Sequence, residues 1–177
     1  MNKVLQKYKY RVSIKDITTI ACLSTLLFAQ EQLLSILPNV QLTIFLILLF
    51  SKKIGFKKTT IIILIHVILD NLLSGYFNPL FVISMFIAYL WTPLLNSFIF
   101  KKINNPILLA LISVICSFLY CWTFILPYSL LFNIKPSVYL IGDIIFELLL
   151  ALSSFISTLM LYPLVNKAIN GQMRHSL

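Results

Sequence analysis

Long apolar runs dominate this chain, and only short breaks of Pro, Asn, Gly and Lys separate them. Hydrophobic residues make up 60% of the chain and charged residues only 11%, whereas a soluble domain has roughly 45–50% and about 25%. A membrane-spanning helix needs about 20 apolar residues, so 177 residues hold at most about six or seven spans. The composition excludes a water-soluble fold, and we expect no catalytic or nucleotide-binding domain within these residues.

Six apolar runs are the predicted helices. They cover residues 16–37, 40–51, 59–77, 79–100, 106–132 and 136–165. The second run is only about 18 Å long, against an apolar core of about 30 Å. It is expected to span with its lysines reaching the interface, to thin the bilayer locally, or to pack inside the bundle. Pro93, Pro127 and Pro163 lie within or near the ends of their runs and are expected to kink or stop those helices.

The basic residues indicate the orientation of these helices. The formal charge is +9, and with six crossings thirteen of the fourteen Lys and Arg residues fall on one side, leaving Lys135 on the other. The positive-inside rule then predicts that both termini are cytoplasmic. The basic clusters are too short to neutralise a nucleic-acid backbone, so no nucleic-acid partner is expected.

The predicted fold class is therefore all-α. We expect an integral membrane protein, surrounded by membrane lipid, with both termini cytoplasmic. Residues 1–177 form a single six-transmembrane-helix bundle, with a basic cytoplasmic N-terminus at 1–15 and a cytoplasmic tail at 166–177. Small residues predict where helices approach closely: Ala110, Ser113 and Ser117 in the fifth run, and Ser153 with Ser157 in the sixth.

Four carboxylates lie inside the apolar runs, where an ionisable group near the bilayer centre costs about 2.5–3.5 kcal/mol. They are Glu31, Asp70, Asp143 and Glu147. Counted from the nearest break, the first three lie about 8–10 Å below the outer surface, with Glu147 one turn deeper. A proton path would need acidic groups through the whole depth of the membrane. The pattern instead predicts a binding pocket that opens to the outside.

Aromatic and amide side chains occur at a similar depth, namely Tyr89, Trp91, Tyr120, Trp122, Tyr139 and Asn71. Flat rings with a few convergent polar groups suit a small heteroaromatic ligand. Asp143 and Glu147 share one helix face at i, i+4 spacing, as do His66 and Asp70. The alternatives are interfacial anchoring for the rings and structural ion pairs or hydrogen bonds for the carboxylates.

Enzyme and metal signatures are missing from the sequence. It contains no HExxH, GxSxG or GxxxxGK motif. His66 with one carboxylate offers too few ligands for a metal ion. Cys22, Cys116 and Cys121 form no CxxC pair and are expected to be buried, reduced thiols. We expect a protein that is not an enzyme and uses no cofactor and no metal.

The chain resembles the substrate-binding S component of energy-coupling factor (ECF) transporters, the vitamin-uptake systems of prokaryotes. The likeness covers almost the whole chain: six helices, both termini inside, a Leu37-Pro38-Asn39-Val40 turn after the first helix, and a short second helix ending in Ser51-Lys52-Lys53. The resemblance implies a location in the plasma membrane of a prokaryote. It also implies a ligand near the outer face, contacted by the fourth to sixth helices and capped by the first loop, which here contains Asn39.

The resemblance further implies protein partners, a transmembrane coupling subunit and two ATPase subunits. Family members dock through an Ala-x-x-x-Ala patch on the first helix, and the corresponding residues here are Ala21 and Thr25. Thiamine-binding members carry a Glu within a Phe-x-Glu-Tyr-Leu-x-x-Pro pattern, where this chain has Ala88. Thiamine is therefore disfavoured, and the expected substrate is another vitamin-like heterocycle with several donors or a partial positive charge.

Two other functions remain open from the sequence. One is a structural membrane subunit of the cell-shape machinery, in which the buried acids would hold helices together. The other is a self-sufficient secondary transporter, which carboxylates in the inner half of the membrane would favour. The runs hold no such inner carboxylates.

Overall fold

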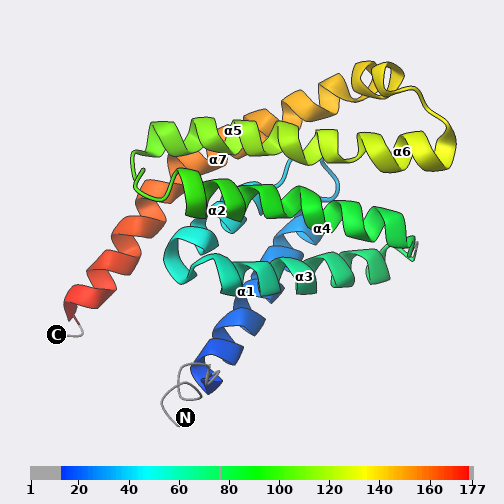
Figure 1. Cartoon of the computed structure of the whole chain (residues 1–177). Coiled ribbons are helices and arrows are strands. Elements are labelled where there is room, and N and C mark those ends of the chain that lie inside the picture. Colours follow the sequence, from blue (N-terminus) through cyan, green and yellow to red (C-terminus); the bar gives the residue numbers. More distant parts are fainter. Residues whose placement is uncertain (1–12, 76, 176–177) are drawn as a thin grey trace, which may run out of the picture.

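The computed structural model describes residues 13–75 and 77–175, with side chains as far as Ala168, and all the elements in these ranges are helices. They are α1 Ile14–Leu34, α2 Thr43–Ile54, α3 Phe56–Leu73, α4 Pro79–Leu94, the π-helix η2 Leu95–Ile99, α5 Pro106–Thr123, α6 Ile125–Phe132 and α7 Pro136–His175. The predicted all-α class is confirmed, and each apolar run forms a helix or a pair of consecutive helices (Figure 1). Most of the predicted basic N-terminus, residues 1–12, lies outside the described ranges.

Four segments are long and apolar enough to cross a membrane. They are Ile14–Leu34, Pro79–Ile99, Pro106–Phe132 and Pro136–Ala168. The helices α2 and α3 do not belong to this set, because α2 has only 12 residues and α3 carries Lys57, Lys58 and Asp70. The protein is thus a membrane-capable helical bundle.

Asn-Pro pairs start two of these long helices. Asn78 precedes Pro79 at the start of α4, and its side chain accepts a hydrogen bond of 2.9 Å from the Leu80 amide. Asn105 does the same for Ile107 at the start of α5, also at 2.9 Å. A proline at the first helical position loses no hydrogen bond, because that N–H has no partner inside the helix. The predicted breaks at these positions are therefore true helix starts.

The prolines inside the runs act differently from one another. Pro127 has no N–H to give to the Thr123 carbonyl, and the fifth run is divided between α5 and α6 at Phe124. Pro93 lies inside α4 and is followed by the π-helix η2. Pro163 does not end its helix, since α7 continues to His175, ten residues beyond the predicted end at Val165.

The short helix α2 lies inside the bundle. It contacts α1, α3, α4, α5, η2 and α7, and all its residues from Thr43 to Ser51 are buried. In Figure 1 α2 is partly hidden behind α4, with α5 and α7 above it and α3 below it. Of the three arrangements expected for the second run, the structure has the one in which it packs within the bundle.

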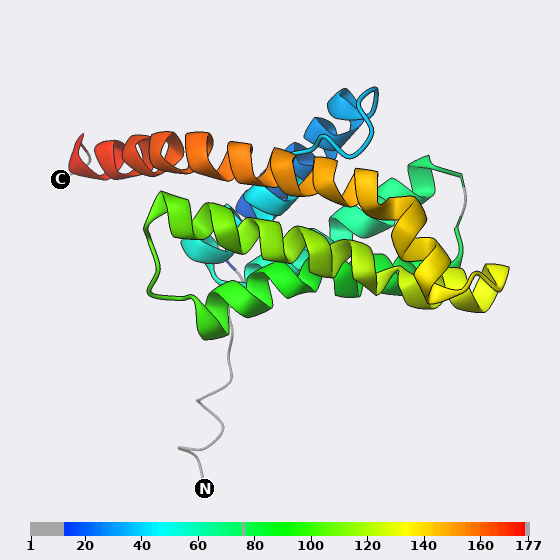
Figure 2. The ribbon, with the colours of Figure 1, turned by 90° about the horizontal axis from the view of Figure 1, so that it is seen from above.

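The helices α5 and α7 pack side by side in antiparallel directions (Figures 1 and 2). Ser113 donates a hydrogen bond of 3.0 Å to the Ser154 carbonyl, and the hydroxyls of Ser117 and Ser154 lie 3.0 Å apart. Ala110, Ser113 and Ser117 are buried. The predicted small-residue contact on the fifth run is confirmed, although the residue of α7 that faces it is Ser154 rather than Ser153.

Several described lysines at the starts and ends of helices lie at one end of the bundle. Lys58 Nζ lies 2.6 Å from Asp16 Oδ1, which joins the starts of α3 and α1. Lys53 donates to Asn166 of α7 at 2.6 Å, and Lys52 donates to the Ile103 carbonyl between α4 and α5 at 2.5 Å. The connection between α6 and α7, which holds Lys135, lies at the opposite end (Figure 1). For the described residues, the basic side chains therefore have the predicted asymmetry.

Candidate functional site

A polar cavity of about 280 Å³ lies where α1 ends. The connection between α1 and α2 forms much of its wall, and α3 and α5 complete it. Its polar lining residues are Glu31, Gln32, Ser35, Asn39, Gln41, Asp70 and Tyr120. Along α1 it is about 22 Å from the ion pair of Asp16 with Lys58, so it is well separated from the basic end. The cavity brings together four predicted site residues from three helices and one loop.

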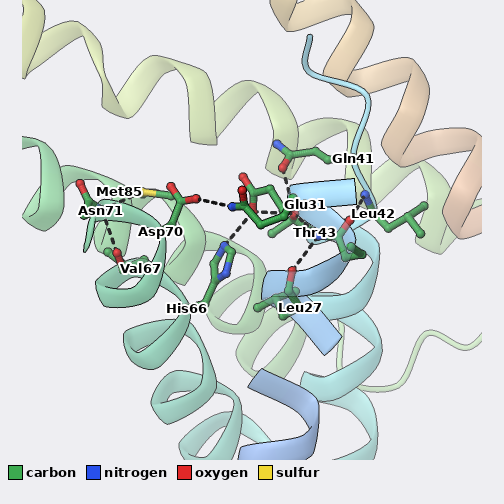
Figure 3. Close-up of polar contacts among 12 residues, drawn as sticks. Leu27, Glu31, Gln41, Leu42, Thr43, His66, Val67, Asp70, Asn71 and Met85 are labelled. Atoms are coloured by element: carbon green, nitrogen blue, oxygen red, sulfur yellow. Dashed lines mark hydrogen bonds and ion pairs between the residues drawn. The ribbon is translucent and has the colours of Figure 1, made fainter. Parts of the chain in front are cut away.

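Each carboxylate of this cavity contacts a residue of the neighbouring helix. His66 Nε2 of α3 lies 2.9 Å from Glu31 Oε2 of α1. Gln32 of α1 donates a hydrogen bond of 3.2 Å to Asp70 Oδ1 of α3. Figure 3 shows His66 pointing across to Glu31, one turn of α3 from Asp70. The i, i+4 spacing of His66 and Asp70 therefore places both beside α1, where each contacts its own partner.

A polar network behind the cavity holds Glu31 against the start of α2. The hydroxyl of Thr43 lies 3.4 Å from Glu31 Oε2 and 2.9 Å from Gln41 Oε1. Gln30 donates to the Thr43 hydroxyl at 2.7 Å and accepts from the Leu42 amide at 2.9 Å. The Leu42 amide lies at the N-terminus of a helix without a side-chain cap, so Gln30 satisfies a donor that would otherwise be unpaired.

The connection between α1 and α2 is fixed to α7. Asn39 has a left-handed backbone (φ 56°), which Asn adopts more readily than most residues. Its side chain donates a hydrogen bond of 3.1 Å to the Phe146 carbonyl. Ser153 accepts from the Gln41 amide at 3.1 Å and donates to the Gln41 carbonyl at 3.0 Å. The loop that lines the cavity is thus held in place by two points of α7.

Aromatic rings connect the cavity with the core. Tyr120 lines the cavity, and its ring centroid is 4.6 Å from that of Tyr89. Tyr89 is fully buried, and its ring centroid is 5.5 Å from the His66 ring. Tyr120 is therefore the ring available to a ligand, while Tyr89 supports it from behind.

Three predicted residues lie outside the lining of the cavity. Asn71 is buried and donates to the Val67 carbonyl at 2.8 Å and to Met85 Sδ at 3.4 Å. Trp91 donates to the Thr123 hydroxyl at 3.2 Å, which links α4 to α5. Trp122 is 49% exposed and lies in an apolar groove on α5. The contacts of Asn71 and Trp91 are those of helix packing, and the Trp122 ring is partly exposed on α5.

The two acidic residues of α7 form a separate cluster. The Tyr139 hydroxyl lies 3.2 Å from Asp143 Oδ2 and 3.4 Å from the Cys121 carbonyl. Glu147 is buried, and its Oε1 has no hydrogen-bond partner among the described residues. Neither Asp143 nor Glu147 lines the cavity beside α1. Depth in the membrane gives a residue's height in the bundle but not the direction it faces, so equal depth did not bring all four carboxylates together.

The predicted docking residues lie on the outer surface of α1. Ala21 and Thr25 are exposed, and the Thr25 hydroxyl donates back to the Ala21 carbonyl at 3.0 Å. Cys22 is also exposed here, contrary to the expectation that all three thiols are buried, while Cys116 and Cys121 are buried as expected. Only 17% of the apolar window of α1 is buried, which leaves one long face of this helix without a neighbour among the described residues.

Within the described ranges, no group of three or more His, Cys, Asp and Glu side chains is arranged to hold a metal ion. Comparison of the chain with protein-family models, with curated proteins and with solved structures finds no match. The fold and the site by themselves define a class: an all-helical protein with membrane-capable helices and a polar cavity between them.

Sequence reasoning missed Gln30, Gln32, Gln41 and Thr43. Each is an uncharged polar residue in the last third of the first apolar run or at the start of the second, and each takes part in the polar contacts around Glu31 and Asp70. The sequence could have indicated them, because these four polar residues cluster around the Pro38-Asn39 turn, next to Glu31.

Proposed function

We propose that the protein is the substrate-specificity (S) component of an ECF-type importer and binds a vitamin-like heterocycle from outside the plasma membrane of a prokaryote. The observation that carries the proposal is the cavity in which Glu31 and Asp70, from two different helices, border the same space as Tyr120. Two acceptors beside a flat ring suit a small heteroaromatic molecule with N–H donors.

The proposed orientation follows from the lysines. The end with Lys52, Lys53 and Lys58 faces the cytoplasm, because basic residues are enriched on that side. The cavity at the far end of α1 then faces outward. In this arrangement all six apolar segments cross or enter the membrane, and both termini are cytoplasmic.

The cavity limits the size of the ligand. Its volume of about 280 Å³ is near the lower limit of ligand pockets, which have about 300–1,000 Å³. A single or fused ring fits, with donors toward Glu31 and Asp70 and one face against Tyr120. The resulting preference is for an aminopyrimidine-like or pyridine-like compound, with Asp143 and Glu147 outside the contact surface.

The protein would supply recognition, and its partners would supply energy. The exposed face of α1 with Ala21 and Thr25 offers small side chains on which a transmembrane coupling subunit can pack closely. Two ATPase subunits on the cytoplasmic side would then drive release of the ligand inward. The fixed loop at Asn39 would hold the ligand until the complex forms.

The test is direct binding by the purified protein. A panel of vitamins and heterocyclic precursors is titrated in detergent, with tryptophan fluorescence and native mass spectrometry as readouts. One compound is expected to bind with a stoichiometry of one, and Asp70→Asn is expected to weaken it at least about tenfold, the effect of losing one charged hydrogen bond. Asp143→Asn is the matched control and leaves affinity unchanged. Failure of every compound to bind contradicts the proposal.

A structural role in the cell-shape machinery is the second candidate. The pairing of His66 with Glu31 and of Gln32 with Asp70 joins α1 to α3, as interhelical contacts in such a subunit would. In that case alanine at the four acidic positions within the apolar runs disrupts cell shape and leaves vitamin uptake intact. Loss of uptake with normal shape supports the S component instead.

A further inference from the structure

A second cavity, of about 630 Å³, lies at the basic end of the bundle. It is bordered by the end of α2, by η2, by the connection between α4 and α5, and by α7. The polar side chains relevant to binding are Lys52, Lys53, Lys101, Asn96, Asn104 and Asn166. Its lining includes three lysines and no Asp or Glu, so the cavity carries positive charge.

The lysines of this cavity contact neutral partners. Lys52 donates to the Ile103 carbonyl at 2.5 Å and lies 3.4 Å from two further carbonyls. Lys53 donates to Asn166 Oδ1 at 2.6 Å. Among the described residues, no carboxylate lies within ion-pair distance of Lys52, Lys53 or Lys101. The charges of Lys52, Lys53 and Lys101 are therefore not neutralised by a carboxylate within the bundle.

Asn96 offers an unused hydrogen-bond acceptor in the same lining. The residue is 2% exposed, and its Nδ2 donates to the Ser51 hydroxyl at 2.5 Å. That hydroxyl donates its own proton to the Leu48 carbonyl at 2.8 Å. It must therefore accept from Asn96, so the NH2 group of the amide faces Ser51. Asn96 Oδ1 is left without a partner among the described residues. A buried acceptor without a donor is costly, so a ligand that supplies a hydroxyl proton here is favoured.

The cavity lies at the membrane surface if the apolar helices span the bilayer. Phe98, at its border, is 73% exposed and packs edge-on against Phe56 with ring centroids 5.7 Å apart. Basic pockets between helices on the cytoplasmic side are where anionic headgroups bind.

We propose that this cavity binds a phosphate ester that carries free hydroxyl groups. The phosphate oxygens accept hydrogen bonds from Lys53 and Lys101, and a hydroxyl of the ester donates to Asn96 Oδ1. Such a group occurs as the glycerol headgroup of phosphatidylglycerol and in soluble glycerol phosphate. The site is separate from the cavity beside α1 and does not depend on the uptake function.

The experiment uses the full chain in detergent micelles and native mass spectrometry. Phosphatidylglycerol, phosphatidylcholine with the same acyl chains and soluble glycerol 3-phosphate are titrated separately. The double variant Lys53→Gln/Lys101→Gln removes two lysines that line the cavity, while Lys102→Gln removes one neighbouring charge outside the lining. Lys52 is kept, because its carbonyl contacts hold the connection between α4 and α5. Circular dichroism checks that each variant is folded.

The wild type is expected to retain one phosphatidylglycerol and no phosphatidylcholine. Each lysine removed from the cavity is expected to weaken binding about fivefold, whereas Lys102→Gln leaves it unchanged. Binding of glycerol 3-phosphate with the same lysine dependence supports the site and assigns it to a soluble ester. Equal retention of both lipids, equal losses in Lys102→Gln and the double variant, or no binding of either ester overturns the proposal.

Discussion

At the scale of single residues, the cavity beside α1 depends on pairings that cross between helices. Glu31 and Asp70 are polar groups in an apolar setting, and each has a partner on the opposite helix, His66 for the first and Gln32 for the second. Burying a carboxylate without such a partner is costly. The same contacts therefore stabilise the bundle and fix the positions of two acceptors at the cavity.

The contact of His66 with Glu31 can be tested by mutation. His66→Ala removes a fully buried ring and leaves Glu31 without its partner, so it is expected to lower the free energy of unfolding by about 2–4 kcal/mol. Glu31→Gln keeps a polar group of similar size and is expected to cost about 1 kcal/mol. Thermal unfolding in detergent measures both. Equal stability of the wild type and His66→Ala would show that the contact contributes nothing.

At the scale of elements, the connection between α1 and α2 is held by Asn39 and Ser153. Asn39→Ala places a less tolerant residue at φ 56° and removes the bond to Phe146, so the loop should loosen and ligand affinity should fall about fivefold to tenfold. Asn39→Gly accepts the same backbone conformation and loses only the side-chain bond. It is therefore expected to lose less affinity than Asn39→Ala. Identical affinities for all three proteins would mean that this loop does not control binding.

The contact of α5 with α7 leads to a prediction on stability. Ser113 is fully buried and bonds to Ser154, so Ser113→Leu forces these two helices apart and is expected to cost about 1–3 kcal/mol. Ile115→Leu on the exposed face of α5 is the control and is expected to change little. Unfolding temperatures in the same detergent compare them. A Ser113→Leu protein as stable as the control would contradict the close packing.

Most helix positions could be predicted from the sequence, because the residues that separate the helices act through local chemistry. Asn78-Pro79 and Asn105-Pro106 start helices where expected, since a side-chain cap and a proline act locally. The end of the sixth run at Val165 was wrong, because Pro163 fits within a helix that continues to His175. Whether a proline ends a helix depends on the contacts beyond it, which local sequence does not contain.

The candidate site was predictable only in part, and for a geometric reason. Spacing along the chain gives the depth of Glu31, Asp70, Asp143 and Glu147, but the direction in which each faces depends on how the helices rotate against one another. Glu31 and Asp70 face a shared cavity, while Asp143 contacts Tyr139 on its own helix. Their partners are a histidine, an amide and two hydroxyls, and hydropathy patterns do not distinguish such residues from isolated polar ones.

At the scale of the whole molecule, the two cavities lie at different ends of the bundle and differ in charge. The smaller one contains Glu31 and Asp70, and the larger one contains Lys52, Lys53 and Lys101. With the lysines on the cytoplasmic side, the acidic cavity receives its ligand from outside and the basic cavity faces the anionic inner leaflet. Both proposals therefore require the same orientation, although each has its own binding test.

That orientation can be measured with single cysteines. In a background with the three native cysteines replaced by Ser, Lys135→Cys is placed between α6 and α7 and Lys102→Cys between α4 and α5, in connections at opposite ends of the bundle. A membrane-impermeant maleimide is expected to label Lys135→Cys on intact cells and Lys102→Cys only after permeabilisation, because the positive-inside rule places the lysine-rich end in the cytoplasm. Labelling in the reverse order means that the bundle has the opposite orientation, which contradicts an outward-facing site. Six spans place one crossing between the two positions, so labelling of both on intact cells means that the segment between them does not cross the membrane.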